Sequence, residues 1–281
     1  MNTASPSLGV TYLRASYAFA ERNWNLVRRY WAWEVVWLVY SIANSLSVSY
    51  IGLGMEVLTG STGNVDAAFL VLYLLIGTLV WRYLSSIFYW VTELITIERW
   101  EGTIEYTLMA PVPRILHMVG HTGFAMIYSL FFTGVILLVT SLMFEIDLAR
   151  ANLLGGLLVL VAGTFSFVGI GIVGAVLPLL FPERGAQMTH IIIATLLLVS
   201  GVYYPVEVLP VAFQAISIVS PATYVLLGVR AALLDAVTLS VLWQYIWPTL
   251  LLALVLVPFG LWTFHQAELF AKRDGRLARN G

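Results

Sequence analysis

The chain has 281 residues, of which 60% are hydrophobic and only 10% are charged. Soluble domains usually carry about 25% charged residues, so the composition excludes a water-soluble globule and indicates an integral membrane protein. The formal net charge of -1 argues against a nucleic-acid partner. The chain contains no cysteine, which excludes disulfides, thiol catalysis and thiolate metal sites.

The first 30 residues are predicted to form a cytoplasmic segment containing an amphipathic helix in the membrane interface. Apolar residues recur there at intervals of three and four and fall on a stripe about 80° wide, with the charged residues on another face. The stripe consists of Leu13, Tyr17, Ala20, Trp24, Val27 and Trp31. A solvated helix packed on protein is the alternative. The segment lacks a charged start followed by an apolar run, so we expect no cleaved signal peptide.

Six segments are long and apolar enough to span a membrane, which takes about 20 residues. They cover residues 31–53, 67–90, 115–144, 152–181, 187–204 and 239–264. The sequence therefore predicts an all-α fold with a six-span membrane domain over 31–265 and a basic cytoplasmic tail over 266–281.

The apolar stretch 205–235 is predicted to differ from the spans, because prolines divide it into pieces too short to cross. Two short extracellular re-entrant helices fit this pattern. Such irregular backbone is tolerated at membrane depth only where protein or water covers it.

The basic residues predict the orientation of the spans, because cytoplasmic loops are enriched in them. Eleven of the 14 lie on one predicted side, namely Arg14, Arg22, Arg28, Arg29, Arg99, Arg114, Arg184, Lys272, Arg273, Arg276 and Arg279. Arg150 and Arg230 lie on the other side, and Arg82 lies inside the second span. Both termini are therefore predicted to be cytoplasmic, and the chain is expected in the cytoplasmic membrane.

A charged stretch over residues 98–114 interrupts this apolar chain between the second and third spans. The acidic residues Glu98, Glu101 and Glu105 form one helical stripe, and the apolar stripe beside it consists of Ile97, Trp100, Ile104 and Leu108. Pro111 and Pro113 stop the helix. The pattern predicts a short cytoplasmic helix over about 98–110, with its apolar stripe on the membrane domain and its acidic edge toward a partner. The alternative is a solvated connector.

The same stretch resembles the E-R-E-x-G-T-L-E-x-L…T-P motif of type-2 ABC exporter permeases, from which Trp100 and Ala110 depart mildly. In that family the segment forms a coupling helix that docks on the ATPase subunit. The resemblance implies docking roles for Glu98, Arg99, Glu101, Gly102, Thr103, Glu105, Leu108, Pro111 and Arg114.

A second stretch, residues 200–230, resembles the family's S-G-x-x-x-P…L-P…N-P-x-T-Y…R sequence, which includes its extracellular re-entrant helices. The two motifs occur in the expected order, and the resemblance covers roughly residues 10 to 265. The aromatic side chains here are either an interfacial belt or the lid of an exit path, and the lid is favoured because prolines fix Tyr203 and Tyr204 in a broken helix. The predicted outer gate consists of Tyr203, Tyr204, Pro205, Pro210, Pro221 and Tyr224.

The chain has no P-loop, because its only lysine, Lys272, does not follow a glycine. ATP and Mg would therefore bind to a separate ATPase, expected in two copies, and this chain is expected to need no cofactor. The resemblance also implies a second permease subunit, identical or different. The cargo is expected to be hydrophobic or amphipathic: a drug, a lipid or a glycoconjugate.

Three further sequence features have both a structural and a functional interpretation. The G-x-G-x-x-G pattern from Gly169 to Gly174 lies inside an apolar segment without the acid that a dinucleotide site needs, so close helix packing is the better interpretation. His117 and His121 could bind a metal at this spacing, but no third ligand is evident, so interfacial histidines are expected. Arg82 lies nearer the cytoplasmic end of its span, so it could snorkel to that surface or pair with Glu34 or Glu93; the alternative is an inner gate or an anion site.

Other functional classes remain as alternatives. A secondary transporter would usually show midplane carboxylates or an internal repeat, and neither is visible. An intramembrane enzyme would need a catalytic pair or a metal motif, and G-x-S-x-G and H-E-x-x-H are absent. A structural scaffold would not need a broken, proline-rich outer segment.

Overall fold

The computed structural model describes residues 8–59, 67–109, 113–144, 146 and 151–274, and every regular element within them is a helix. Within this part, five helices are long and apolar enough to cross a membrane, or six if one bent pair counts as a single span. The predicted all-α class is confirmed.

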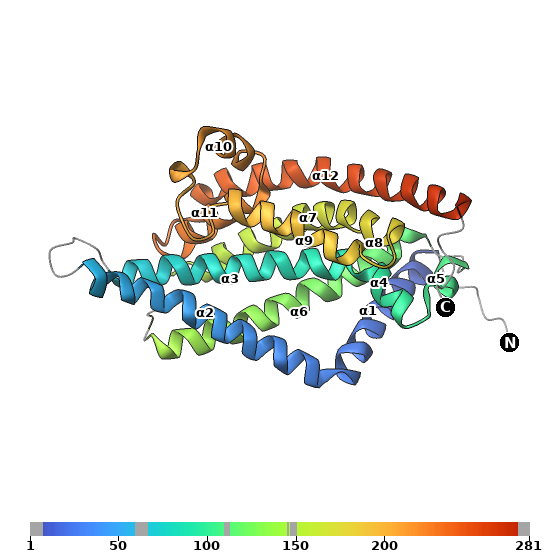
Figure 1. Ribbon diagram of the computed structural model, residues 1–281, viewed down its shortest axis with the longest axis horizontal. Coiled ribbons are helices and arrows are strands. Elements are labelled where there is room, and N and C mark those ends of the chain that lie inside the picture. The colour runs from blue at the N-terminus through green and yellow to red at the C-terminus, as the bar shows by residue number, and fades with distance from the viewer. Residues whose placement is uncertain (1–7, 60–66, 110–112, 145, 147–150, 275–281) are drawn as a thin grey trace.

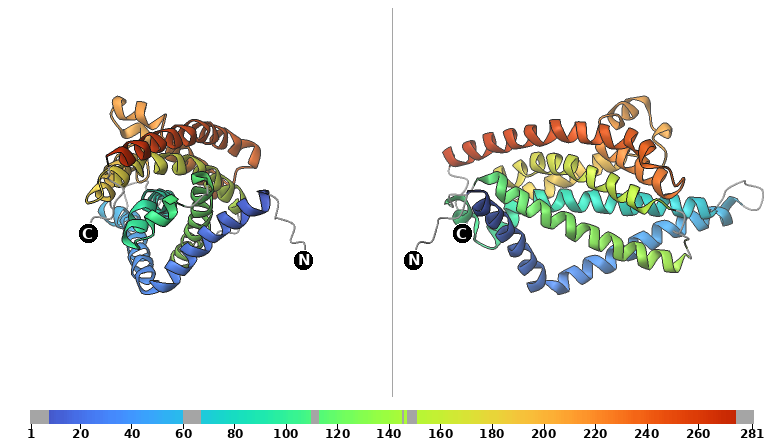
Figure 2. Two further views of the ribbon diagram at one scale, coloured as in Figure 1. Left: turned by 90° about the vertical axis from the view of Figure 1, so that its right-hand side faces the viewer. Right: turned by 180° about the vertical axis from the view of Figure 1, so that it is seen from behind.

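The chain begins with two helices that meet at an elbow. α1 (Leu8–Arg29) and α2 (Trp31–Thr59) are separated by Tyr30 alone and point in different directions (Figures 1 and 2). α1 packs against α6 (Arg114–Met143), and α2 packs mainly against α3 (Ala67–Thr92). The predicted apolar stripe of α1 is largely exposed at Leu13, Tyr17 and Trp24, so it does not pack on the described part of the protein.

α3 is the central helix of the molecule. It packs against α2, α6, α7 (Leu153–Gly174) and α11 (Pro221–Leu233), and its middle is fully buried at Tyr83, Leu84 and Phe88. Its position explains why it is apolar on nearly every face, whereas α2 and α6 keep wide exposed faces.

α7 packs closely on α12 (Leu239–Arg273) and α3 because its glycines carry no side chain. A Cβ atom at Gly169 would lie 2.7 Å from Leu256 of α12, and one at Gly174 would lie 2.7 Å from Thr92 of α3. The G-x-G-x-x-G pattern thus serves helix packing, as predicted. After a break at Ala175 the chain continues as α8 (Val176–Leu180), and the two helices together cover the predicted fourth span.

The fifth predicted span is shorter than expected. α9 (Gly185–Val199) ends five residues before Tyr204, because the chain turns at Gly201, whose φ of 72° lies in the left-handed region. Its 15 residues reach about 22 Å, less than the roughly 30 Å of a hydrocarbon core.

Three prolines divide the segment after α9, as predicted. Pro205 and Pro210 precede η1 (Val206–Val208) and α10 (Val211–Ser217), and Pro221 opens α11. α10 and α11 are bent by 79° relative to each other.

The last helix is longer than predicted. α12 continues to Arg273 despite Pro248 and Pro258 in its interior, so the first part of the expected 266–281 tail is helical. Its final turns lie at the same end of the molecule as the start of α1 and the short helices α4 (Leu94–Trp100) and α5 (Ile104–Met109), whereas α10 lies toward the other end (Figures 1 and 2).

Candidate functional site

The charged stretch folds as two short helices rather than the single helix predicted over 98–110. α4 ends in a Schellman motif, in which the Thr103 amide donates to the Glu98 carbonyl at 2.9 Å and the Gly102 amide to the Arg99 carbonyl at 3.1 Å. Gly102 adopts a φ of 71°, which a glycine adopts without strain. α5 then starts in a new direction.

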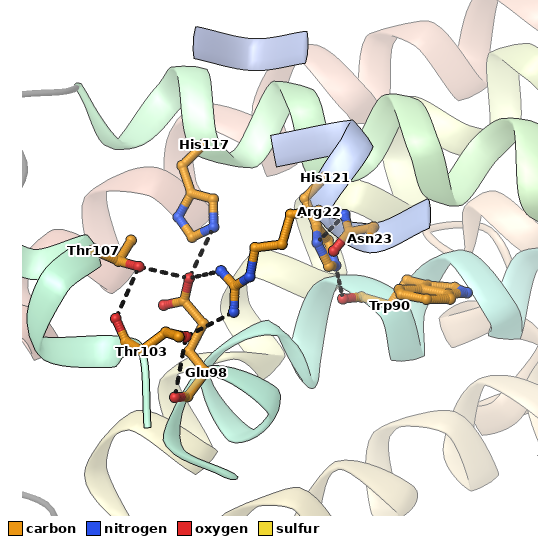
Figure 3. A network of polar contacts seen from close by, with 8 residues as sticks. All are labelled: Arg22, Asn23, Trp90, Glu98, Thr103, Thr107, His117 and His121. Carbon is orange, nitrogen blue, oxygen red and sulfur yellow. Dashed lines mark hydrogen bonds and ion pairs between the residues drawn. The ribbon is translucent and has the colours of Figure 1, made fainter. Parts of the chain in front are cut away.

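Glu98 is the centre of a buried polar cluster that we call the Glu98 junction (Figure 3). Its Oε1 atom lies 2.8 Å from Arg22 Nη1 and 3.2 Å from His117 Nε2, and it accepts a hydrogen bond from Thr107 at 3.1 Å. Arg22 Nη2 also donates to Thr103 Oγ1 at 2.8 Å. The junction joins α1, α4, α5 and α6 through one carboxylate.

The Glu98 side chain is only 1% exposed. Burial alone would raise its pKa, but the hydrogen bond and charge of His117, together with those of Arg22, outweigh burial and hold the pKa of Glu98 below its usual 4.5. The prediction that Glu98 faces a partner is therefore wrong, because Arg22 and His117 draw its carboxylate inward.

α1 is fastened to α6 by further contacts beside the junction. Asn23 Nδ2 lies 2.8 Å from Nδ1 of His121, whose Nε2 lies 2.5 Å from the Trp90 carbonyl (Figure 3). If Asn23 donates to Nδ1, the Nε2–H donates to Trp90, and this tautomer satisfies both ring nitrogens. A Cβ atom at Gly120 would lie 2.2 Å from the Ser16 carbonyl, so the glycine permits this close packing.

The two histidines are buried in the protein rather than interfacial as predicted. Both are engaged by protein groups, His117 by Glu98 and His121 by Asn23 and Trp90. In the part of the chain that the structure describes, no three histidine or acidic residues are grouped as metal ligands.

The outward surface of α4 and α5 carries large apolar side chains. Trp100 is 67% exposed, and Tyr106 and Met109 are each 73% exposed. The predicted arrangement, with Trp100 on the membrane domain, is therefore reversed at this position. Glu101 is mostly buried and lies 3.5 Å from the exposed Arg29. A shallow polar hollow borders this surface, lined by Ala18, Glu21, Arg22, Asn25, Leu26, Arg29 and Glu101.

The remaining predicted docking residues divide into two groups. Arg99 Nη2 donates to the Leu179 carbonyl at 3.1 Å, which ties α4 to the last turn of α8, and burial lowers the pKa of Arg99. Pro111 lies outside the described residues, as do the side chains of Glu105, Leu108 and Arg114.

The predicted outer-gate tyrosines are held by backbone contacts. The Tyr204 hydroxyl donates to the Leu198 carbonyl at 2.6 Å, and the Tyr224 hydroxyl donates to the Ile218 carbonyl at 2.8 Å. Tyr203 is half-buried against the core. These tyrosines lie with Pro205, Pro210 and Pro221 within residues 203–224, which we call the segment around α10.

Arg230 of α11 fixes the end of α9, a role that the sequence did not predict. Its guanidinium donates to the Gly201 carbonyl at 2.9 Å and the Val202 carbonyl at 2.6 Å, and lies 3.6 Å from the centroid of the Tyr73 ring. α3 can approach because a Cβ atom at Gly77 would lie 2.1 Å from the Val202 carbonyl. The sequence feature that could have indicated this role is an arginine in an apolar segment, because a buried arginine needs hydrogen-bond acceptors.

Arg82 of α3 lies apart from both regions. Its guanidinium is 5.7 Å from the centroid of the Phe132 ring, and it interacts electrostatically with Glu34 and Tyr128. The predicted pairing with Glu34 does not reach contact distance, because the Tyr128 hydroxyl donates to the Glu34 carboxylate instead.

Together these features define a multi-pass helical membrane protein with a polar junction at one end and a proline-divided segment toward the other. A family model described as ABC-2 type transporter matches residues 14–234. The chain therefore belongs to this family and is a permease component of an ABC transporter, as its motifs predicted. Permeases of this family are generally partnered with an ATP-binding-cassette ATPase. A comparison with curated proteins found no matching sequence.

Proposed function

We propose that this permease exports a hydrophobic or amphipathic compound across the cytoplasmic membrane, driven by a separate ATPase. Drugs, lipids and glycoconjugates belong to this class. ATP and Mg bind to the ATPase, which is present in two copies, and a second permease subunit completes the transport path. The excess of basic residues at the α4–α5 end supports a cytoplasmic position for that end and for both termini.

The observation that carries this proposal is the combination of a buried Glu98 with an exposed apolar surface beside it. We take the exposed side chains of Trp100, Tyr106 and Met109 together as one patch suited to protein contact, since aromatic residues and methionine are enriched at interfaces. The polar hollow adjoins the patch at Glu101 and adds charged groups at its rim. We assign this surface, defined as the α4–α5 face, as the ATPase contact.

The Glu98 junction makes the α4–α5 face part of a rigid unit. A force on α4 is passed to α1 through Arg22 and to α6 through His117. α3 leads from α4 toward the other end of the molecule, where Arg230 joins α11 and the end of α9 to the same helix. ATP-driven movement of the α4–α5 face would thus reach the segment around α10. In this proposal α10 and α11 are a pair of re-entrant helices, and this segment is the outer gate.

The test is association with the ATPase after Trp100→Ala and Tyr106→Ala are introduced together. Both side chains are exposed, so the folded permease is expected to survive while co-purification of the ATPase falls at least tenfold. Phe131→Ala with Ile127→Ala is the matched control, because these side chains are equally exposed but lie on the membrane-spanning part of α6. Unchanged co-purification and unchanged ATP-dependent export in the Trp100/Tyr106 variant would refute the assignment.

A further inference from the structure

Arg82 of α3 and Arg230 of α11 have sharply different surroundings. Arg230 donates hydrogen bonds to carbonyl oxygens and stacks on Tyr73. The Nε atoms of both arginines are buried without a partner, but Arg82, unlike Arg230, makes no hydrogen bond or ion pair through its Nη atoms with any residue that the structure describes. A guanidinium carries five N–H donors, and leaving them unpaired away from water is costly. The difference between the two arginines therefore lies in the Nη donors, which have backbone acceptors in Arg230 and none in Arg82 among the described residues.

Arg82 is also deep in its span. Arg82 lies ten residues before Thr92, the last residue of α3, which corresponds to about 15 Å of helix. A charged side chain at such depth usually faces a partner or a functional path. The ring of Phe132 offers a cation–π contact at 5.7 Å, but such a contact does not replace the oxygen acceptors that the five N–H groups of a guanidinium can bind.

The nearest acid does not fill this role. The carboxylate of Glu34 accepts a hydrogen bond from the Tyr128 hydroxyl and influences Arg82 only at a distance. Because Tyr128 binds the Glu34 carboxylate, the N–H donors of Arg82 remain available to a ligand, and the negative charge of Glu34 remains nearby. That charge disfavours a second anion of high charge, so a singly charged group is the best match for Arg82.

Phe132, whose ring lies beside Arg82, belongs to a row of aromatic side chains on α6 that we call the aromatic wall. Phe124, Tyr128 and Phe132 lie four residues apart on α6, with neighbouring ring centroids 5.9 and 4.4 Å apart. Trp90 of α3 packs edge-on against Phe124 and Tyr128 at 5.3 and 5.2 Å. Glu34, Arg82 and Tyr128 are each only half-buried, so the cluster is not sealed. An apolar wall beside an unsatisfied cation is the chemistry that recognises an amphiphile with an anionic headgroup.

We infer that Arg82 binds the singly charged anionic headgroup, a phosphodiester or a carboxylate, of the amphiphile that this permease carries. The apolar part of the amphiphile lies along the aromatic wall of α6. This inference rests on the proposed export function and narrows its cargo from hydrophobic or amphipathic compounds to anionic amphiphiles.

The experiment measures lipid retention by native mass spectrometry on the full chain in nanodiscs of mixed phosphatidylglycerol and phosphatidylcholine. Arg82→Gln is expected to lower retention of phosphatidylglycerol about tenfold, as loss of one charge-assisted hydrogen bond predicts. Arg82→Lys restores part of it, because the charge remains without the planar donors. Phosphatidylcholine retention stays constant in both variants.

Two variants at neighbouring residues separate binding from a structural role. Glu34→Gln removes the nearby negative charge and is expected to raise phosphatidylglycerol retention. Tyr128→Phe releases the Glu34 carboxylate to pair with Arg82 and is expected to lower it. A purely structural cluster would lose stability in every variant without this opposite effect. Equal phosphatidylglycerol retention in the wild type and Arg82→Gln, from lipids bound adventitiously around the protein, would overturn the inference.

A second arm distinguishes cargo from a resident lipid. In the complex with its ATPase, addition of ATP is expected to reduce the Arg82-dependent retention of phosphatidylglycerol as cargo is released. If retention stays constant in a complex that hydrolyses ATP, the phosphatidylglycerol is a resident lipid and the cargo assignment is overturned. Retention without ATP needs no ATPase, so it can be measured even if the export proposal fails. Conversely, working export with retention independent of Arg82 overturns only the inference.

Discussion

At the scale of single residues, Glu98 shows how a charge can stabilise a membrane protein from within. Its carboxylate is buried, yet two cationic or hydrogen-bonding partners and one hydroxyl surround the same oxygen. A buried charge with its partners in place is tolerated, whereas removal of one member leaves the others uncompensated. The three partners of Glu98 lie on three other helices, and Arg22 is 76 residues away in the chain. Glu98 therefore fixes tertiary structure.

Glu98→Gln is therefore expected to destabilise the permease by about 2 kcal/mol, because the amide cannot replace the charge that Arg22 and His117 face. The melting midpoint in detergent should fall by roughly 4–8 °C. Glu101→Gln is the control: its partner Arg29 is largely exposed at 3.5 Å, and such pairs contribute less than about 1 kcal/mol. Equal midpoints for the two variants would contradict the assigned role of the junction.

The loss of stability in Glu98→Gln relative to the wild type is expected to depend on pH. The pKa of Glu98 is lower in the folded protein than its usual 4.5, so its contribution to stability is complete above about pH 4.5 and is lost as pH falls through the lower folded value. The difference in melting midpoint between wild type and Glu98→Gln should thus be constant near neutral pH and shrink below pH 4.5. A difference that grows on acidification would show that the carboxylate is not stabilised by its neighbours.

At the scale of elements, hydropathy predicted where helices run, and backbone conformation decided where they end. The spans at 31–53, 67–90 and 115–144 match α2, α3 and α6 closely because apolar length is a local property of the sequence. The predicted ends of α9 and of the 98–110 helix are wrong, because Gly201 and Gly102 turn the chain at positive φ and an apolar pattern does not reveal such turns. The inward direction of Glu98 depends on Arg22, 76 residues away, and no local pattern contains it.

Gly102→Ala is expected to loosen the end of α4. An alanine at a φ of 71° costs about 1 kcal/mol, which weakens the Schellman hydrogen bonds of Thr103 and Gly102. Amide hydrogen exchange over residues 98–107 should accelerate severalfold. Gly102→Asn should exchange at an intermediate rate, because asparagine tolerates the left-handed region better.

Gly134→Ala provides the matched control for this change. Gly134 lies inside α6, and a Cβ atom there would meet nothing within 4 Å, so the substitution should leave exchange at the turn unaltered. Acceleration by both variants would attribute the effect to something other than the conformation of Gly102.

At the scale of the whole molecule, the two ends have different chemistry. One end carries the Glu98 junction and the α4–α5 face, and the segment around α10 lies toward the other, with α3 between them (Figure 1). The proposed mechanism requires these ends to be on opposite sides of the membrane. Hydropathy alone does not fix which end is cytoplasmic, and the predicted orientation depends on the distribution of arginines.

The absence of cysteine from the sequence makes this orientation directly measurable. Met109→Cys in α5, Val211→Cys in α10 and Phe131→Cys in α6 replace side chains with exposed fractions of 73%, 81% and 67%. In intact cells a membrane-impermeant maleimide should label the cysteine at 211 only, and in inverted vesicles it should label the one at 109 unless the ATPase covers it. The cysteine at 131 should stay unlabelled in both, because lipid surrounds a side chain that is otherwise equally exposed. Labelling of position 109 from outside would reverse the topology, and the α4–α5 face could then meet no cytoplasmic ATPase.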